Sequence, residues 1–190
     1  FDHTISDDLK SVFKINDIVL NYNDSVWYLG KPDLENNNLF VYGQDYKELK
    51  SIKLVSGNQI IEFNFFDNNI DFNFNSNFQN VNFESLIPKP KNILYQGLVN
   101  GYIKLNKKDE TYQGNSNLSI KNFSANGDVL GNASLKINPS NKLDNYNLLF
   151  NINDSIYDIF NLEGNFEIAS NDFPIDFKLK TEKFKLNPFS

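Results

Sequence analysis

The residue types that most often carry out catalysis or bind metals are scarce in this sequence. Its single histidine, His3, lies close to Asp2, Asp7 and Asp8, a grouping that would suit a metal site or an acid–base pair. The chain has no cysteine and no second imidazole, so a transition-metal site and a hydrolytic triad both lack the partners that they need. We therefore interpret His3 as part of a frayed, solvated terminus.

Carboxylate pairs are the next candidates, because two carboxyl groups can act as acid and base in glycoside hydrolysis. Two such candidates are Asp109 with Glu110 and Asp45 with Glu48. Both lie in charged stretches that are typical of solvated loops, and nothing distinguishes either pair as catalytic.

A third candidate is Asp67-Asn68-Asn69 with Asp71, which has some of the oxygen ligands of a calcium loop. It lacks the glycine and the terminal glutamate of that motif, so a hairpin turn is the better interpretation. The sequence therefore predicts a protein that is not an enzyme, with no catalytic residues, no metal ligands and no cofactor.

Composition argues against a further class of function. The formal net charge is -6, and all 18 basic residues are lysines. Nucleic-acid binding depends on clustered cations, and arginine supplies the bidentate contacts to guanine and phosphate, so we expect no nucleic-acid partner. No apolar run is long enough to span a bilayer as a helix. Because the chain begins at Phe1, we interpret it as a piece cut from a longer protein.

Alternation of apolar and polar residues is the strongest pattern in the chain. Successive side chains on a β-strand point to opposite faces, so each alternating segment has one apolar and one polar face. These segments are Ile61–Phe65, Ile70–Phe74, Val81–Phe83, Ile103–Leu105, Leu118–Ile120, Leu135–Ile137, Phe150–Ile152, Phe166–Ile168 and Ile175–Leu179. Turn signals separate them, at Ser56-Gly57-Asn58, Asp67-Asn68-Asn69, Asn126-Gly127-Asp128, Asn138-Pro139-Ser140 and Ser170-Asn171-Asp172.

This pattern predicts an all-β antiparallel meander of roughly 12 to 14 strands. Two stretches interrupt it. The proline-containing segment 88–91 is predicted to be a crossing between a first meander, 1–87, and a second, 92–190, that continues it. Residues Asp154 to Asn161 suit either a short helical turn or an irregular strand. Periodicity alone leaves a sandwich, a closed barrel and a sheet folded lengthwise into a trough all open.

Several phrases resemble one family when they are read in order. The phrases are Ser25–Leu29, Ile52–Phe63, Val81–Pro88, Gln96–Leu105, Leu118–Gly127 with Leu130-Gly131, and Phe184–Phe189. Together they resemble the TamB translocation and assembly module family, in its Bacteroidota form, within the wider AsmA-like group. The resemblance covers about residues 20 to 190. The family normally has a glycine soon after the strand that ends at Phe63, whereas Asn64-Phe65-Phe66 stands there in this chain.

The resemblance implies both a fold and a function. Members of the family are anchored in the inner membrane of Gram-negative bacteria and extend across the periplasm. Their β-segments form an elongated antiparallel sheet folded lengthwise into an open hydrophobic trough, often called a β-taco. The trough is expected to conduct phospholipid acyl chains to the outer membrane, or to hold outer-membrane β-strands with a BamA-like or TamA-like barrel partner. This chain would be an internal segment, with its membrane anchor outside the residues given.

The candidate site is therefore the apolar face of the sheet. From the pattern alone this face would be an ordinary core, packed against a second sheet; the resemblance favours an open trough that binds lipid. Two alternatives remain: chaperone-like binding of barrel strands, and a surface β-sandwich or adhesin module with a closed core. The residues predicted to line the trough are Phe63, Phe65, Phe72, Phe74, Phe83, Ile103, Leu105, Ile120, Ile137, Phe150, Phe166, Ile168, Phe177 and Leu179.

Overall fold

The described part of the chain forms a single antiparallel β-sheet. The structure is a computed structural model that describes residues 1–6, 8, 10–23, 25–31, 38–88, 93–108, 111–140, 145–154, 158–167 and 174–181. Within these ranges 14 strands occur, together with one short 3-10 helix and no α-helix. The predicted all-β fold is confirmed.

The strands are β1 (Asp2–Ile5), β2 (Ser11–Lys14), β3 (Val19–Tyr22), β4 (Ser25–Leu29), β5 (Leu39–Gly43), β6 (Tyr46–Ser56), β7 (Gln59–Asp67), β8 (Phe72–Asn82), β9 (Tyr95–Lys108), β10 (Thr111–Ala125), β11 (Asp128–Pro139), β12 (Asn145–Asn153), β13 (Asp158–Glu167) and β14 (Ile175–Thr181). The 3-10 helix η1 (Phe83–Ser85) follows β8 directly.

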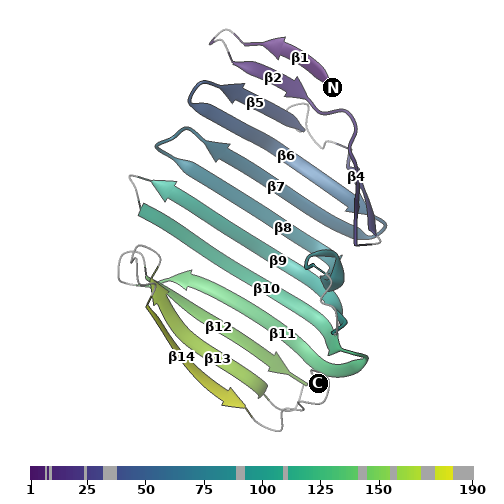
Figure 1. Cartoon of the computed structure of the whole chain (residues 1–190), viewed down its shortest axis with the longest axis vertical. Helices are drawn as coiled ribbons and strands as arrows, with labels where there is room; N and C mark the ends of the chain where they lie inside the picture. Colours follow the sequence, from purple (N-terminus) through teal and green to yellow (C-terminus); the bar gives the residue numbers. More distant parts are fainter. Residues whose placement is uncertain are drawn as a thin grey trace.

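Strand order follows the chain almost without exception. The sheet runs from β1 through β2 and β5 to β14, each strand antiparallel to the next, while β3 and β4 form a hairpin that leaves this path and joins it only through β6 (Figure 1). Strands β8 and β9, on either side of the predicted crossing at 88–91, pair directly. Residues 89–91 of that crossing lie outside the described part of the chain. The sheet is therefore continuous across this point.

Cross-strand register divides the side chains between two contrasting faces. Direct partners in an antiparallel sheet lie on the same face, so a row of partners can be followed from strand to strand. One row on the inner face reads Ile52, Phe63, Ser76, Ile103, Ser116, Ile137, Leu148. The adjacent row on the outer face reads Lys53, Glu62, Asn77, Tyr102, Asn117, Lys136, Leu149. The sheet is thus apolar on one side and polar on the other.

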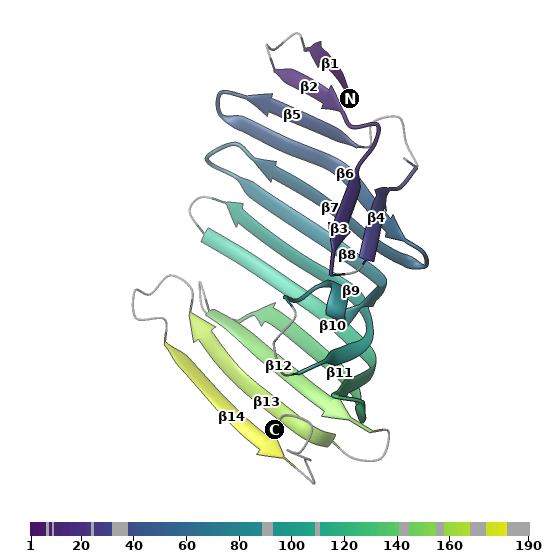
Figure 2. The ribbon, with the colours of Figure 1, turned by 45° about the vertical axis from the view of Figure 1, so that its right-hand side comes forward.

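The inner face is concave, and small residues contribute to its hollow shape. In the inner row, the small residues Ser76 and Ser116 alternate with larger neighbours and are buried beneath them, at 4% and 5% exposed. At Gly101 the φ angle is 129°, and an added Cβ would lie 2.0 Å from the carbonyl oxygen of Asn117, so only glycine fits this close approach of two strands. The ribbon curves around the hairpin β3–β4 (Figure 2), and the sheet forms an open trough folded along its length.

Bulges preserve the inner face where the alternation slips by one residue. Register shifts separate Leu49 from Ile52, Phe78 from Val81, and Ile120 from Phe123. At each shift the two apolar residues are three positions apart, and the inserted residue keeps both on the inner side. Because a bulge bends its strand and increases its twist, these insertions also contribute to the curvature of the trough.

Each bulge contains a backbone N–H that donates a hydrogen bond to the side-chain oxygen of an asparagine on the neighbouring strand. The residues with positive φ at the bulges are Ser51, Asn80 and Asn122. Their N–H groups donate to the Oδ1 atoms of Asn64, Asn100 and Asn132, at 2.7, 3.0 and 3.1 Å respectively. All three acceptors lie on the outer face. Part of the asparagine content is therefore structural, since it satisfies donors that the ladder leaves unpaired.

Some sequence-based boundaries were wrong. Ile70 lies in the turn between β7 and β8, where the backbone N–H groups of Ile70 and Asp71 both donate to Asn68 Oδ1, so the strand begins only at Phe72. The predicted turn residue Pro139 instead ends β11, paired with Tyr146. The turns at Gly57-Asn58 and at Asn126-Gly127 are confirmed as two-residue connections.

Two other expectations also need correction or completion. His3 is not frayed: it lies in β1 and pairs with Phe13 of β2, and its ring stacks on the Phe13 ring with 4.6 Å between centroids. Asn64-Phe65-Phe66, where a glycine was expected from the family, forms no turn, because β7 continues to Asp67. In the stretch 154–161, β13 begins at Asp158, which favours the strand over the helical turn; residues 155–157 and the predicted turn at 170–172 lie outside the described residues.

We expect the asparagine acceptors at the bulges to stabilise the fold measurably. Replacing Asn100 with Ala leaves the N–H of Asn80 without its acceptor and should lower the free energy of unfolding by about 0.5–1.5 kcal/mol. Urea denaturation of the variant measures this change. Asn77→Ala is the control, because Asn77 is an exposed residue of the same outer face with no such acceptor role. Equal loss of stability in both variants would contradict the interpretation.

Candidate functional site

The predicted lining residues converge on the inner face of the trough. Phe83 lies in η1, not in a strand as predicted, yet it packs against both buried clusters. Ile168 lies outside the described part of the chain. The others share the inner face by register: Phe63, Phe65, Phe72, Phe74, Ile103, Leu105, Ile120, Ile137, Phe150, Phe166, Phe177 and Leu179.

One side of this face is covered by the β3–β4 hairpin. The side chain of Trp27, on β4, is 2% exposed and packs with Val81 and Val99 of the sheet. The backbone of β4 pairs with the end of β6 through Tyr28 and Leu29 only. Apolar residues around Trp27, including Phe78 and Leu118, are partly buried by the same contact. This half of the trough is a closed hydrophobic core.

A polar latch holds the hairpin to η1. Asn23, in the β3–β4 turn, has a φ of 46° and donates its side-chain amide to the carbonyl oxygens of Glu84 and Ile87, at 3.0 and 2.6 Å. The hydroxyls of Ser25 and Ser85 lie 2.9 Å apart, within hydrogen-bonding distance. Asparagine tolerates the left-handed backbone better than most residues, so one residue supplies both the turn and the latch.

A second buried cluster continues the closed half beyond η1. Phe123, Leu130, Ala133 and Ile152 are buried there, and the partly buried Phe83 packs against them. The Phe83 ring meets the Phe123 ring edge-on, with 5.8 Å between centroids. Aromatic pairs in this geometry add about 0.5–1.5 kcal/mol beyond area burial, so η1 is held by packing as well as by the latch.

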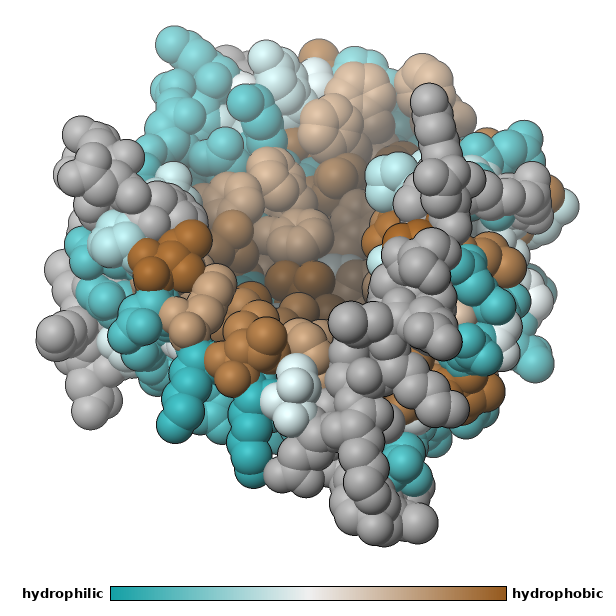
Figure 3. Space-filling view, turned by 60° about the horizontal axis from the view of Figure 1, so that its bottom comes forward, coloured by the Kyte–Doolittle hydropathy of each residue, from teal (hydrophilic) through white to brown (hydrophobic). Residues whose placement is uncertain are grey.

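The other side of the inner face is open. Phe65 pairs with Phe74, which pairs with Leu105, and all three are only partly buried. The Phe65 ring also meets the Phe72 ring edge-on, at 5.5 Å between centroids. The space-filling view shows a hollow whose visible walls are mainly hydrophobic (Figure 3). The open half is thus an apolar floor that water or a ligand can reach.

The same floor continues at both ends of the sheet. Toward β14, the inner-face side chains of Phe177 and Leu179 are 44% and 57% exposed. Tyr146, whose ring stacks on Phe166 at 5.4 Å, is itself buried beside them. Toward β1, a mainly apolar cavity of about 450 Å³ lies over Phe13, Phe40 and other residues of the first strands. The apolar surface therefore extends along the length of the described sheet.

Titratable groups do not form a catalytic arrangement among the described residues. Glu48 accepts a hydrogen bond from the Tyr46 hydroxyl at 2.7 Å and lies 3.4 Å from Lys50 Nζ. Burial, and then this hydrogen bond to Glu48, raise the pKa of Tyr46 to about 12, which removes it as an acid or base near neutral pH. Asp45 accepts from the side-chain amide of Asn69. The residues Asp109 and Glu110 lie outside the described chain.

The described segments contain no group of three or more histidine or carboxylate side chains placed to hold a metal ion. In those segments, no helix has the length and apolar character needed to cross a membrane.

Some residues of the inner face were not predicted from the sequence. Trp27 belongs to a hairpin that folds back over strands far along the chain, and nothing local indicates that contact. Val81 was placed in an alternating segment but not among the lining residues, and Phe78 was in neither set, because a bulge between Phe78 and Val81 breaks the period-two pattern. The sequence indicates this bulge in one way only: Phe78 and Val81 are three positions apart, with Asn80 between them.

Comparison with protein-family models, with curated proteins and with solved structures finds no match for the chain.

We expect the fluorescence of Trp27, the chain's only tryptophan, to report any loosening of the latch. Asn23→Gly keeps a residue that accepts the left-handed backbone but removes both side-chain hydrogen bonds, to Glu84 in η1 and to Ile87 just after it. The acrylamide quenching constant of Trp27 should rise and its emission should shift to the red, because the hairpin separates more often from the sheet.

The control is Asn122→Gly, which removes another side chain at positive φ but is remote from the hairpin in sequence. Quenching that is unchanged in Asn23→Gly would show that Trp27 packing alone holds the hairpin closed.

Proposed function

We propose that this chain is a segment of a periplasm-spanning, AsmA-like protein, and that its trough conducts phospholipids between the inner and outer membranes. The observation that carries the proposal is the open apolar half of the inner face, which stands beside a closed half and opposite a polar outer face. Large exposed apolar surfaces on soluble domains mark interaction sites, and an elongated one suits an elongated apolar ligand.

The energetics of such a surface suit movement as well as binding. An acyl chain gains about 0.8 kcal/mol for each methylene group that leaves water. The attraction is non-directional, so a chain can shift along the floor without breaking specific contacts. Partly buried phenylalanine and leucine side chains such as Phe74 and Leu105 supply this surface.

The place of the segment in a larger protein is supported by the same features and by the resemblance to the TamB family. Strands β1 and β14 are the two ends of the strand order in the described sheet, and each pairs with one described strand. A neighbouring segment with the same architecture would extend the trough in either direction. Periplasmic location, inner-membrane anchoring through another segment, and a BamA-like or TamA-like barrel partner all belong to this proposal.

The two faces of β11 offer a direct test of acyl-chain binding. Ile137 lies on the inner face and its neighbour Lys136 on the outer face. Ile137→Glu places a carboxylate on the floor and should weaken the binding of a fluorescent fatty acid at least tenfold, which corresponds to about 1.4 kcal/mol. Lys136→Glu adds the same group to the opposite face and should leave affinity within about twofold.

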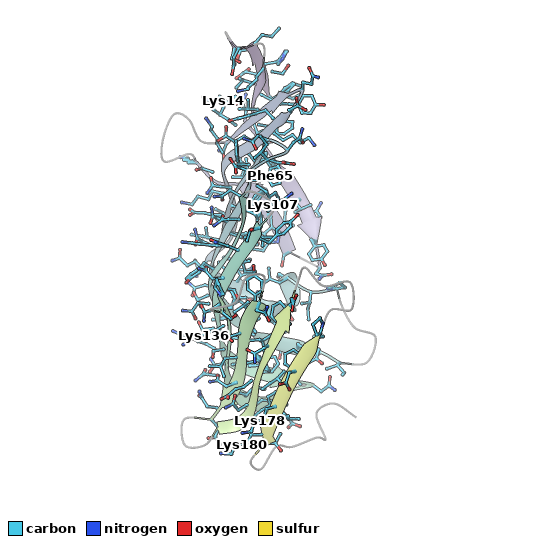
Figure 4. All side chains as sticks on the ribbon, turned by 90° about the vertical axis from the view of Figure 1, so that its left-hand side faces the viewer. Lys14, Phe65, Lys107, Lys136, Lys178 and Lys180 are labelled. Atoms are coloured by element: carbon cyan, nitrogen blue, oxygen red, sulfur yellow. The ribbon has the colours of Figure 1, made fainter. Side chains whose placement is uncertain are left out.

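Circular dichroism of both variants checks that the sheet has formed. Equal affinities for wild type and folded Ile137→Glu would sink the proposal that lipid binds along the inner face. Figure 4 shows Lys136 on the side of the sheet away from the hairpin.

A second function, binding of outer-membrane β-strands, is favoured by the edge strand β14. Every residue of β14 is exposed, and its apolar side chains Ile175, Phe177 and Leu179 are 44–57% exposed. The ring of Phe177 covers the backbone of Gly164, where an added Cβ would lie 1.9 Å from the ring. A strand at the edge of a sheet can accept an extended segment through main-chain hydrogen bonds.

Photo-crosslinking in cells separates the two functions. A benzoylphenylalanine at Phe74, on the open floor, should capture lipid, whereas the same probe at Leu179 should capture barrel-protein segments only if the edge binds strands. The outer-face position Asn117 is the control. Lipid captured equally at Phe74 and Asn117 would argue against conduction through the trough.

A further inference from the structure

The open rim of the trough contains a small cavity whose chemistry differs from that of the floor. It has a volume of about 360 Å³ and lies where the β7–β8 turn meets the paired ends of β9 and β10. The residues that define its character are Asp67, Asp71, Phe72, Leu105, Lys107 and Tyr112. Charged and aromatic groups thus meet at the border of an apolar surface.

The cavity is continuous with the open floor. Phe72 lines it and also contacts the ring of Phe65 on the floor, with 5.5 Å between centroids. Leu105 lines it and pairs with Phe74. Phe65 and Lys107, both labelled in Figure 4, are linked through Phe72, which contacts the Phe65 ring and is the cross-strand partner of Lys107. An amphiphilic molecule could therefore occupy both surfaces at once.

The polar groups of the cavity have unused binding capacity. Lys107 Nζ lies 5.5 Å from the centroid of the Tyr112 ring, and it forms no ion pair with a carboxylate of the described residues. Within the same residues, the Asp71 carboxylate accepts no hydrogen bond, and Asp67 accepts one, from the backbone N–H of Asn69 at 3.0 Å. One cation and two carboxylates are thus available to a ligand.

We propose that this cavity holds the zwitterionic headgroup of a phospholipid with a primary ammonium, while the acyl chains lie on the apolar floor. The assignment rests on the lipid-binding role proposed above and adds a headgroup preference to it. The phosphate lies against Lys107, and the ammonium lies against Asp67 and Asp71.

Charge and hydrogen-bonding capacity select this headgroup chemistry. A lysine ammonium forms charge-assisted hydrogen bonds with phosphate, and an ammonium ligand offers three donors to carboxylates. The Tyr112 ring adds cation–π attraction for a positive group nearby. A headgroup that carries only negative charge would meet two carboxylates against one cation. Lys47, the cross-strand neighbour of Asp67, is exposed and does not line the cavity.

The number of N–H donors on the headgroup also affects binding in the cavity. A trimethylammonium group has the same charge as a primary ammonium but no N–H, so it would give the two carboxylates no hydrogen bond beyond the one that Asp67 already accepts from the Asn69 N–H. Burying polar groups without partners is unfavourable. The cavity is therefore expected to rank ethanolamine above choline, and choline above glycerol, in phospholipids with identical acyl chains.

The test uses the whole chain and vesicles of equal parts dioleoyl phosphatidylethanolamine, phosphatidylcholine and phosphatidylglycerol. The protein is incubated with vesicles and separated from them, and its bound lipids are quantified by mass spectrometry. We expect phosphatidylethanolamine to exceed phosphatidylglycerol about fivefold. The double variant Asp67→Asn/Asp71→Asn should bring this ratio to about one while total bound lipid is retained.

Single substitutions separate the two ends of the headgroup. Lys107→Gln should reduce all three phospholipids severalfold but leave the binding of oleyl alcohol unchanged, because the alcohol has no phosphate. The matched controls are Lys136→Gln on the outer face and Asp128→Asn at the β10–β11 turn; both should preserve the wild-type lipid distribution.

Two outcomes overturn the headgroup assignment alone: wild-type protein that recovers the three lipids in the vesicle ratio, and a fivefold preference that persists in the Asp67→Asn/Asp71→Asn variant. In both cases lipid binding by the trough stands. Wild-type protein that recovers no lipid at all overturns the headgroup assignment together with the proposed function.

Discussion

The structure depends on keeping apolar side chains on one face of a sheet that bends. A slip of one residue moves every later side chain of a strand to the opposite face, and the bulges in β6, β8 and β10 prevent that outcome by inserting one residue where the apolar spacing is three. Each insertion leaves a backbone donor that an outer-face asparagine accepts, as between Asn80 and Asn100. The polar face is therefore more than a solvated surface, because its asparagines satisfy the backbone donors that the curvature of the apolar face leaves unpaired.

Curvature in turn divides the inner face into two halves with different physical roles. The β3–β4 hairpin fills one half, where Trp27, Val81 and Val99 exclude water and form a conventional core. The second buried cluster around Phe123 extends this core along the same side. Burial there can stabilise the fold without any ligand, which leaves the partly buried residues of the other half free to bind one. A trough that was open over its whole width would have to rely on its ligand for stability.

The sequence predicts the local features of this arrangement and misses the distant ones. Alternation in stretches such as Ile61–Phe65 identifies both the strands and the inward side chains, because strand geometry alone decides which face a residue takes. The turn at Asn126-Gly127 is equally local, since its two residues favour the positive φ angles that it requires. By contrast, the contact of Trp27 with Val81 joins residues far apart in the sequence. Phe83 satisfied the strand pattern, yet it begins a 3-10 helix because its ring packs against Phe123 and η1 is latched to the hairpin.

The candidate site shows the same limit for a further reason. An apolar floor has no distinctive residue chemistry, so a list of inward phenylalanines identifies a surface but not its ligand. Selectivity has to come from polar groups at the border of that surface. These groups lie in turns, and the alternation pattern predicts only where a turn separates two strands. Asp67 and Asp71 belong to such a turn, and it becomes part of a cavity only because β9 brings Lys107 beside Phe72. A non-directional floor would let acyl chains slide, and a charged rim would fix which end of the lipid lies outward. Both properties together make the open half of the trough suited to an amphiphile, whereas a purely apolar ligand would need the floor alone.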